Sequence, residues 1–426
     1  MMISNAKKYN EAFVWIWLPD ETSPIVAGKL SRNGDALVFN YGKSYLARSD
    51  SIAIYAPELS LIPGFLPLLP NMSMPSCIRD ASPDAWGRRV IINKMLGAKG
   101  KNAETSQLDE LTYLLESSSD RIGALDFQLS PTHYESRLSK NVPLEELLRA
   151  AEYVEKGLPI SSELNHALNH GTSIGGARPK ALIEHNNKKY IAKFSSSSDL
   201  YSVVKAEFIA MRLAQLCGLN VASVLLTQSL NKDVLLIERF DRSLSKSGWK
   251  RKCMVSCLTL LELDEMMARY ASYKNLAEII RHRFTDASMT LKELFGRLIF
   301  NILSGNTDDH ARNHAAFWDG QMLTLTPAYD ICPQNRTGYE ASQAMLIDDT
   351  RMSKLSACLD AAYMFLISEK EALSIVEHQI NVINNNWELV CMEANINETD
   401  KAFLWRRQFL NPFAFDDLKG NRSILN

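Results

Sequence analysis

The dipeptide Asp319-Gly320 constrains the fold of this chain more than any other feature. It stands between the apolar runs HAAFW and QMLTL, and an Asp-Gly pair in that setting is the strongest short-range signal for a β-hairpin. If Trp318 pairs with Gln321, the chain returns past the loop that precedes the hairpin. The spacing then predicts that polar side chains from either side of the hairpin converge, namely Asp308, Asn313 and Asp330.

A buried helix and a polar loop lead into this hairpin. The helix is indicated by an apolar stripe at helical spacing, formed by Leu291, Leu294, Leu298 and Ile302. Thr290 and Glu293 fit a capping box at the start of the helix, and Gly305 fits its end. The residues that follow, 306–313, read NTDDHARN.

The three convergent side chains suit phosphoryl transfer. That reaction needs a carboxylate that orients and deprotonates the attacking hydroxyl, and oxygen ligands that hold Mg²⁺ against the phosphates. Asp308 and Asn313 have the spacing found in the catalytic loop of protein kinases, and Asp330 takes the position of the metal-binding aspartate beyond the hairpin. The alternative interpretation of this segment alone is an ordinary Asp- and Asn-rich turn after a helix.

The residues upstream complete a kinase-like order. GTSIGGARPK (171–180) is a glycine loop that leads into a hairpin, and Lys193 lies at the end of the second strand, YIAKF. Glu207 lies in the first half of the next helical segment, which Gly218 would end. A kinase site needs such a lysine after a phosphate loop, and a glutamate on the next helix. One Lys–Glu pair would carry little weight, but the order of all these features favours an ATP site.

The pattern of strands and helices predicts an α+β chain with a protein-kinase-like two-lobe fold. Its β-rich N-terminal lobe carries an extra N-terminal subdomain, and its C-terminal lobe is mostly helical. We expect the β-rich N-terminal subdomain at 1–128, the nucleotide-binding lobe at 129–246 and the helical catalytic lobe at 247–426. KSGWKRK (246–252) is interpreted as a solvated connection, and PDAWGRR (83–89) as a helix start with Asp84 near its N-terminus.

Composition argues against several other classes of protein. A formal net charge of −2 disfavours a generic binder of nucleic acid or other polyanions. The seven cysteines have neither zinc-ligand nor disulfide spacing, which indicates a reducing cytoplasm. The most apolar stretch near the start, LIPGFLPLLP, holds three prolines, so we expect no membrane-spanning helix there and no membrane partner.

Two departures from the ordinary protein-kinase pattern point to a particular family. The glycine loop reads SIGGARPK rather than GxGxxGxV, and the expected catalytic aspartate is followed rather than preceded by a histidine, His310. Further motifs run through nearly the whole chain: PDAWGRR, YIAKF, IERFDR (237–242), NTDDHARN and LTPAYDI (325–331). On these motifs the sequence resembles the HipA family of bacterial toxin kinases.

This resemblance implies a role for each matching residue. Asp308 would be the catalytic base, Asn313 and Asp330 would bind Mg²⁺, and the neighbouring Asp309 would support them. Ser173 matches the serine that such kinases autophosphorylate. The residues expected to bind ATP are Lys193 and Glu207, the backbone around Glu238 and Phe240 as an adenine hinge, and Gly175, Gly176, Lys180 and His310.

The resemblance further implies an ATP- and Mg²⁺-dependent serine/threonine protein kinase that is the toxin of a toxin–antitoxin module. Its expected partners are a protein substrate and a small DNA-binding antitoxin, through which the chain could dimerise. Two other functions stay open: a small-molecule phosphotransferase on a kinase-like scaffold, and a catalytically inactive corepressor that binds the antitoxin. The intact Asp308, Asn313 and Asp330 argue against the corepressor, because binding alone does not need them.

Overall fold

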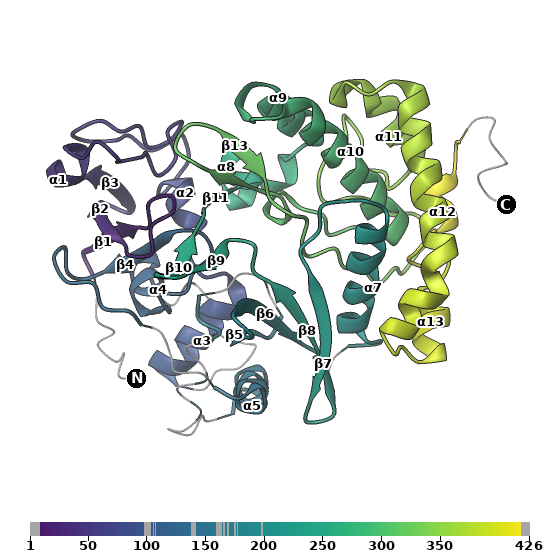
Figure 1. Cartoon of the computed structure of the whole chain (residues 1–426), viewed down its shortest axis with the longest axis horizontal. Helices are drawn as coiled ribbons and strands as arrows, with labels where there is room; N and C mark the ends of the chain where they lie inside the picture. The colour runs from purple at the N-terminus through teal and green to yellow at the C-terminus, as the bar shows by residue number, and fades with distance from the viewer. Residues whose placement is uncertain are drawn as a thin grey trace. The chain divides into compact units, whose positions relative to one another are not determined.

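A computed structural model describes residues 9–97, 104, 106, 108–137, 142–158, 164, 167, 170–173, 176, 178–196 and 199–418 (Figure 1). The chain divides into two compact units. Unit 1 comprises Met1–Ser196, Thr227–Val255 and Phe317–Gln321, and unit 2 comprises Ser197–Leu226, Ser256–Ala316 and Met322–Asn426. Most of the strands lie in unit 1 and most of the long helices in unit 2, so the predicted α+β class is confirmed. The division at residues 128 and 246 stays a prediction.

The first sheet of unit 1 has the strand order β3-β2-β1-β4. Its strands are β1 (Glu11–Ile16), β2 (Ile25–Asn33), β3 (Ala36–Tyr41) and β4 (Leu125–Gln128). Gly34 turns the chain between β2 and β3 with φ +61°, a conformation that costs glycine little. β4 returns from much later in the sequence and pairs antiparallel with β1.

The second sheet has the order β5-β6-β8-β7. Its strands are β5 (Lys180–His185), β6 (Lys188–Phe194), β7 (Val224–Ser229) and β8 (Lys232–Glu238). Asn186 and Asn187 have φ values of 49° and 58°, and Leu230 and Asn231 have 49° and 60°. Two consecutive left-handed residues are the signature of the tight type I′ turn, whose twist matches that of the flanking strands. The hairpin expected after the glycine loop is therefore present.

The segment KSGWKRK is not a solvated connection, so that interpretation is wrong. It contributes to a two-stranded ribbon of β9 (Arg242–Ser245) and β10 (Gly248–Arg251), which β11 (Cys253–Ser256) follows. Arg251 is only 8% exposed. Its guanidinium lies 3.4 Å from the centre of the Trp17 ring and donates to the Ser119 carbonyl at 2.8 Å. An aromatic face and a carbonyl from distant parts of the sequence thus replace water around the charge.

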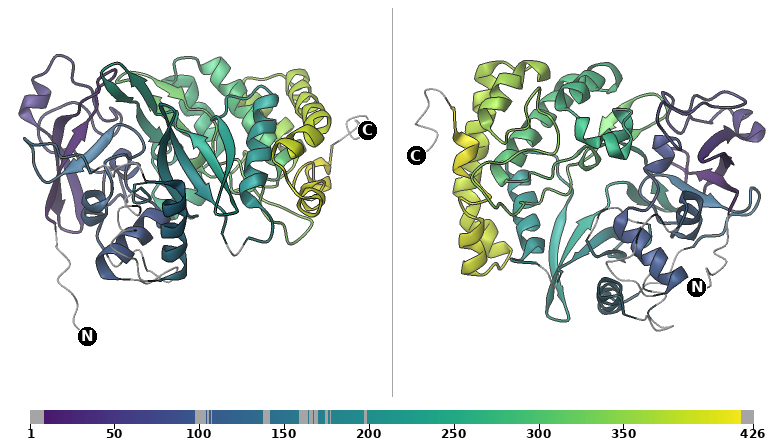
Figure 2. Two further views of the ribbon diagram at one scale, coloured as in Figure 1. Left: turned by 60° about the horizontal axis from the view of Figure 1, so that its bottom comes forward. Right: turned by 180° about the vertical axis from the view of Figure 1, so that it is seen from behind.

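Long helices pack together in unit 2 (Figure 2). α12 (Glu369–Glu393), α10 (Ala287–Ser304) and α7 (Val203–Leu216) contact one another pairwise. Gly218 follows α7 with φ +83°, as predicted for a glycine that ends a helix. The other α-helices of the described residues are α1 (Lys43–Leu46), α2 (Ser76–Arg79), α3 (Ala85–Leu96), α4 (Glu110–Glu116), α5 (Leu144–Lys156), α8 (Cys257–Leu260), α9 (Tyr273–Arg283), α11 (Leu355–Ala361) and α13 (Glu398–Leu404). Across the described ranges, no helix is both long and apolar enough to cross a bilayer.

Helix α10 begins before the predicted capping box. The Asp286 side chain accepts a hydrogen bond from the Met289 amide at 3.1 Å, so the helix starts at Ala287. Thr290 and Glu293 therefore lie inside the helix, and the predicted cap is wrong. Aspartate caps at least as well as threonine, so the earlier of the two candidate caps decides the start.

The end of α10 is where the sequence predicts it. Gly305 has φ +71°, and a Cβ at this position would lie 2.7 Å from the carbonyl oxygen of Gln408. Glycine is required here both by the left-handed backbone and by the close approach of another segment. The polar loop 306–313 starts at this point.

The hairpin after the polar loop is present, but its turn is longer than predicted. β12 (Ala315–Trp318) and β13 (Leu323–Leu325) are neighbouring strands joined by residues 319–322. Asp319 accepts from the Gln321 amide at 2.8 Å, and Gly320 has φ +103°. The predicted pairing of Trp318 with Gln321 is therefore wrong, although the chain still returns past the polar loop.

Candidate active site

The polar loop after α10 is held by its own hydrogen bonds. Asn313 closes a short 3₁₀ helix, Ala311–Asn313, and its amide donates to the His310 carbonyl at 2.8 Å. The side-chain Nδ2 of Asn313 donates to the Asp308 carbonyl at 3.2 Å. Asn313 is buried, whereas the Asp308 side chain reaches solvent. One hydrogen bond thus joins the residue expected to act as base to a residue expected to bind metal.

The segment after β13 brings Asp330 back to this loop. The Thr326 amide donates to the Ala315 carbonyl at 3.0 Å, and the Tyr329 hydroxyl donates to the Arg312 carbonyl at 2.7 Å. Asp330 itself has φ +60°, in the left-handed region that aspartate tolerates better than most residues. The left-handed turn of the backbone therefore falls at the residue expected to bind metal.

Asp308 and Asp330 lie near enough to interact electrostatically. Partial burial raises the pKa of Asp308, and the carboxylates of Asp330 and Asp309 add to this effect while His310 opposes it. Mutually repelling carboxylates are relieved by a cation or a shared proton. Nδ1 of His310 is buried without a hydrogen-bond partner among the described residues, and its expected contact with ATP stays a prediction.

Beneath the loop lies a buried hydrogen-bond network that the sequence did not indicate. His314 Nε2 lies 2.9 Å from Asp309 Oδ1 and 3.3 Å from the Tyr273 hydroxyl, and that hydroxyl also donates to Asp309 Oδ2. Burial opposes ionisation of Asp309, but His314 and the hydrogen bond from Tyr273 outweigh it and lower the pKa of Asp309. Asp309 therefore anchors the loop, as the family resemblance implies. Tyr273 comes from α9, and no local pattern could have indicated it.

Arg297 is a second residue that the sequence did not indicate. It is buried in α10, where its guanidinium donates to the Thr326 carbonyl at 2.9 Å and to Glu293 at 2.7 Å. A charged side chain on the apolar stripe of a helix is a signal that could have identified it. Arg297 fixes the strand that leads to Asp330.

Two lysines of unit 1 lie side by side. Lys180 at the start of β5 is paired directly across the ladder with Lys193 near the end of β6, and both side chains are less than 9% exposed. Directly paired residues place their side chains on the same face of a sheet. Gly176, with φ +89°, lies so close that a Cβ on it would be 2.3 Å from Lys180 Nζ. The sequence-predicted glycine loop and lysines are thus brought together.

The motif PDAWGRR holds this glycine loop. Asp84 precedes α3 as predicted, but its carboxylate does not cap the helix and accepts instead from the Gly176 amide at 2.9 Å. The Trp86 amide donates to the Gly176 carbonyl at 3.0 Å, and its indole donates to the Lys180 carbonyl at 2.9 Å. Gly176 would have to exchange Asp84 for a phosphate if it bound ATP through its amide. Gly175 lies outside the described residues.

Ser173 and the expected adenine hinge also belong to unit 1. Ser173 is buried, and its hydroxyl donates to the Asp120 carbonyl at 3.0 Å. β8 ends at Glu238, which pairs with Lys188 at 2.7 Å, and the Phe240 ring lies 5.9 Å from that of Phe317. Lys193 belongs to unit 1 and Glu207 to unit 2, so their pairing stays a prediction.

The donor set of unit 2 fits a magnesium ion. The side-chain nitrogen of Asn313 is used by the Asp308 carbonyl, so the oxygen is the atom that Asn313 would offer, and Asp330 would add a carboxylate. In the part of the chain that the structure describes, no three His, Cys, Asp or Glu side chains form a group that could hold a metal ion alone. Mg²⁺ needs no such cage, because it is commonly bound by one or two carboxylates together with water and substrate phosphates.

Comparison with known families divides the chain into two matched parts. The family model described as HipA-like C-terminal domain matches residues 172–387, about half of the chain. The model described as HipA N-terminal domain matches residues 16–128.

One curated protein and one solved structure are similar to this chain. The serine/threonine-protein kinase toxin HipA of Shewanella oneidensis is 26% identical over 202 residues, which are 42% of this chain and 47% of that protein. The match thus spans about half the length of this curated relative. Among solved structures, a chain of the HipA, HipB and operator DNA complex of Shewanella oneidensis MR-1 has a TM-score of 0.69 at 19% identity. That match covers 93% of this chain and 95% of the other, and at this identity it shows the predicted kinase-like α+β fold alone.

Proposed function

Because the chain belongs to the HipA family, we propose that it is a serine/threonine protein kinase that uses ATP and Mg²⁺. The observation that carries this proposal is the cluster of unit 2. There partial burial and the nearby Asp330 raise the pKa of Asp308, and Asn313 is bonded to the Asp308 carbonyl. Phosphoryl transfer to a hydroxyl requires a solvent-accessible carboxylate as base, near oxygen atoms that can ligate Mg²⁺.

Each residue of the cluster has a separate task in this proposal. Asp308 accepts the proton of the attacking serine or threonine hydroxyl, and a raised pKa favours that step because a base works best near the ambient pH. Asn313 and Asp330 hold Mg²⁺, which when bound neutralises charge on the phosphates. Asp309 remains ionised in its contact with His314 and keeps the loop in position.

The paired lysines of unit 1 support binding of a triphosphate. Lys180 and Lys193 are buried directly opposite each other on β5 and β6, so both ammonium groups extend from one face of the sheet near the glycine loop. A lysine ammonium is a compact positive charge that suits contact with the phosphates of ATP. Glu207 would orient Lys193, and the backbone around Glu238 and Phe240 would bind the adenine.

The proposed biological role is that of the toxin in a toxin–antitoxin module. The partner would be a small DNA-binding antitoxin, by analogy with the HipB and operator DNA complex of the structural relative. Control would come from autophosphorylation at Ser173. Its hydroxyl is buried against the Asp120 carbonyl, so a phosphate of roughly −1.5 to −2 charges could not occupy that position without displacing the segment. A displaced segment could no longer form the glycine loop over ATP.

Phosphoproteomics after brief expression tests this function directly. Cells producing the wild-type chain should gain phosphorylated serine or threonine sites, and cells producing Asp308→Asn should not. The Asp319→Asn variant is the matched control, since it makes the same substitution in the exposed hairpin turn. With purified protein and radiolabelled ATP, Asp308→Asn should slow transfer by about 100-fold or more while still binding nucleotide.

The outcomes separate the proposed kinase from the other two functions. Transfer by Asp308→Asn at the wild-type rate would refute the assignment of the base. Label that enters small metabolites and no protein would favour a small-molecule phosphotransferase. A wild-type chain that binds an antitoxin but transfers no label would be a corepressor.

A further inference from the structure

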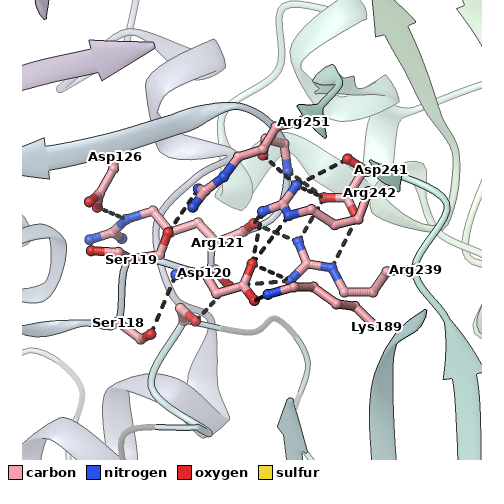
Figure 3. A network of polar contacts seen from close by, with 12 residues as sticks. Ser118, Ser119, Asp120, Arg121, Asp126, Lys189, Arg239, Asp241, Arg242 and Arg251 are labelled. Carbon is pink, nitrogen blue, oxygen red and sulfur yellow. Dashed lines mark hydrogen bonds and ion pairs between the residues drawn. The ribbon is translucent and has the colours of Figure 1, made fainter. Parts of the chain in front are cut away.

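Asp120 connects the N-terminal part of unit 1 to the expected adenine hinge (Figure 3). Its carboxylate lies 2.9 Å from Arg239 Nη1, 3.1 Å from Arg242 Nη2 and 2.6 Å from Lys189 Nζ. Arg239 and Arg242 belong to the motif IERFDR, which also contains Glu238 and Phe240. A residue matched by the N-terminal family model thus contacts a motif matched by the C-terminal one.

Among the described residues, two carboxylates pair with both arginines of this motif. The side chains of Arg239 and Arg242 are 1% exposed, and besides Asp120 they pair with Asp241, which lies 2.8 Å from each. Burial would raise the pKa of Asp120, but Arg239, Arg242 and Lys189 outweigh it and hold that pKa well below its ordinary value. Loss of the Asp120 charge would leave the two arginines with Asp241, and Lys189 with Glu184 at 3.7 Å. Buried charges that lose a partner are strongly destabilised, so the segment would have to shift.

The turn after β8 couples this cluster to the hinge. β8 ends at Glu238, Phe240 and Asp241 lie in the turn, and β9 begins at Arg242, so the buried Arg239 and Asp241 are interleaved with the hinge residues along the chain. The Arg239 amide also donates to the Lys189 carbonyl at 2.8 Å, which fixes the backbone at the end of β8. A shift of Arg239 would therefore move the hinge backbone with it.

Asp120 also contacts the glycine-loop segment. The Ser173 hydroxyl and Arg239 Nη1 both donate to the Asp120 carbonyl, at 3.0 Å and 3.4 Å. One residue thus receives a hydrogen bond from the segment expected to cover the phosphates and from the motif expected to bind the base.

We propose that Asp120 is a positioning residue for nucleotide selection, because it holds the 238–242 segment in the geometry that recognises adenine. The inference rests on the proposed function, in which the backbone at Glu238 and Phe240 binds the base. It assigns to the N-terminal domain a part in nucleotide recognition, although that domain supplies no residue expected to touch ATP.

The test compares Asp120→Asn with Asp126→Asn. Asp126 is also buried and pairs with two arginines, Arg121 at 2.9 Å and Arg137 at 2.8 Å, but neither partner belongs to the 238–242 segment. Dissociation constants for ATP, GTP and tripolyphosphate are measured for both variants in the full chain, with melting temperatures as the check of folding. Asp120→Asn should lower the preference for ATP over GTP by about fivefold or more, whereas Asp126→Asn should leave that preference unchanged. The affinity for tripolyphosphate should change little in either.

Each result decides between the inference and its premise. A wild-type chain that binds ATP no better than GTP would overturn the adenine hinge itself, and with it this part of the proposed function. A wild-type preference that survives in Asp120→Asn, or falls equally in Asp126→Asn, would overturn the role of Asp120 alone. If Asp120→Asn does not fold, Lys189→Gln replaces it, since it removes one partner of Asp120 and should reduce the same preference to a smaller extent.

Discussion

Replacing Asp241 by asparagine should destabilise the protein at neutral pH, and the loss should diminish in acid. Asp241 is buried, and its carboxylate accepts from Arg239 at 2.9 and 2.8 Å, from Arg242 at 2.8 Å and from the Gly123 amide at 2.8 Å. Burial opposes its ionisation. The two arginines and these hydrogen bonds outweigh burial and lower the pKa of Asp241 from 3.8 to about 2.

This pKa shift sets the expected size of the effect. A difference of roughly 2 units corresponds to about 2–3 kcal/mol of unfolding free energy at neutral pH. Because the pKa is lower in the folded state, this contribution is complete above the unfolded value of 3.8 and disappears as the pH falls towards 2. The substitution also leaves two buried guanidinium groups short of an anion, so the total loss should reach about 3–5 kcal/mol at pH 7.

Urea unfolding of wild type and Asp241→Asn at several pH values between 7 and 3 measures this difference. Asp20→Asn is the control, because Asp20 lies 2.9 Å from Lys250 but its side chain is 86% exposed, and this variant should unfold at the wild-type midpoint. A deficit in Asp241→Asn that is the same at pH 3 as at pH 7 would show that the missing charge is not its cause.

Four further substitutions test the site and the fold. Asp330→Asn keeps a side chain that tolerates φ +60°, so it should weaken binding of Mg²⁺-ATP without unfolding the chain, and unchanged magnesium dependence of transfer would contradict the metal role. Lys193→Ala should abolish phosphoryl transfer. A fully active Glu207→Gln would refute the supporting Lys193–Glu207 ion pair even if Lys193 proves essential. Ser173 should carry phosphate in wild-type protein and none in Asp308→Asn, as mass spectrometry would show. Gly305→Ala should lower the unfolding free energy by about 1 kcal/mol or more, since a Cβ would lie 2.7 Å from the Gln408 carbonyl oxygen, and an unchanged urea midpoint would contradict that clash.

Local signals located the elements well where the determining interaction is itself local. Gly218 and Gly305 end their helices, and the Asn186-Asn187 turn closes its hairpin, because left-handed backbone is a property of one or two residues. The start of α10 was wrong for a reason of the same kind, since Asp286 offers an equally good cap four residues before Thr290. The KSGWKRK segment was wrong for a different reason: Arg251 lies over Trp17, far away in the sequence.

Spacing along the chain predicted which polar residues would lie near one another, and their roles stay predictions. A helix, a loop and a hairpin of short connections bring Asp308, Asn313 and Asp330 together even though the turn is longer than predicted, since a longer turn changes the register of the hairpin and not its direction. The supporting residues could not be found in this way. Tyr273 and Arg297 reach the site from helices whose packing depends on the whole of unit 2.

The two adjacent aspartates of NTDDHARN could not be distinguished from the sequence. Asp308 and Asp309 have the same side chain, so only their different surroundings in the fold can give them different pKa values. Partial burial and repulsion from Asp330 raise the pKa of Asp308, whose side chain reaches solvent, while His314 and Tyr273 lower the pKa of the fully enclosed Asp309. Neighbouring acids whose pKa values are driven apart can divide the work of a site, one exchanging protons and the other staying charged. The backbone gives the two acids these different surroundings, since it turns one side chain outwards and the next one inwards against α9.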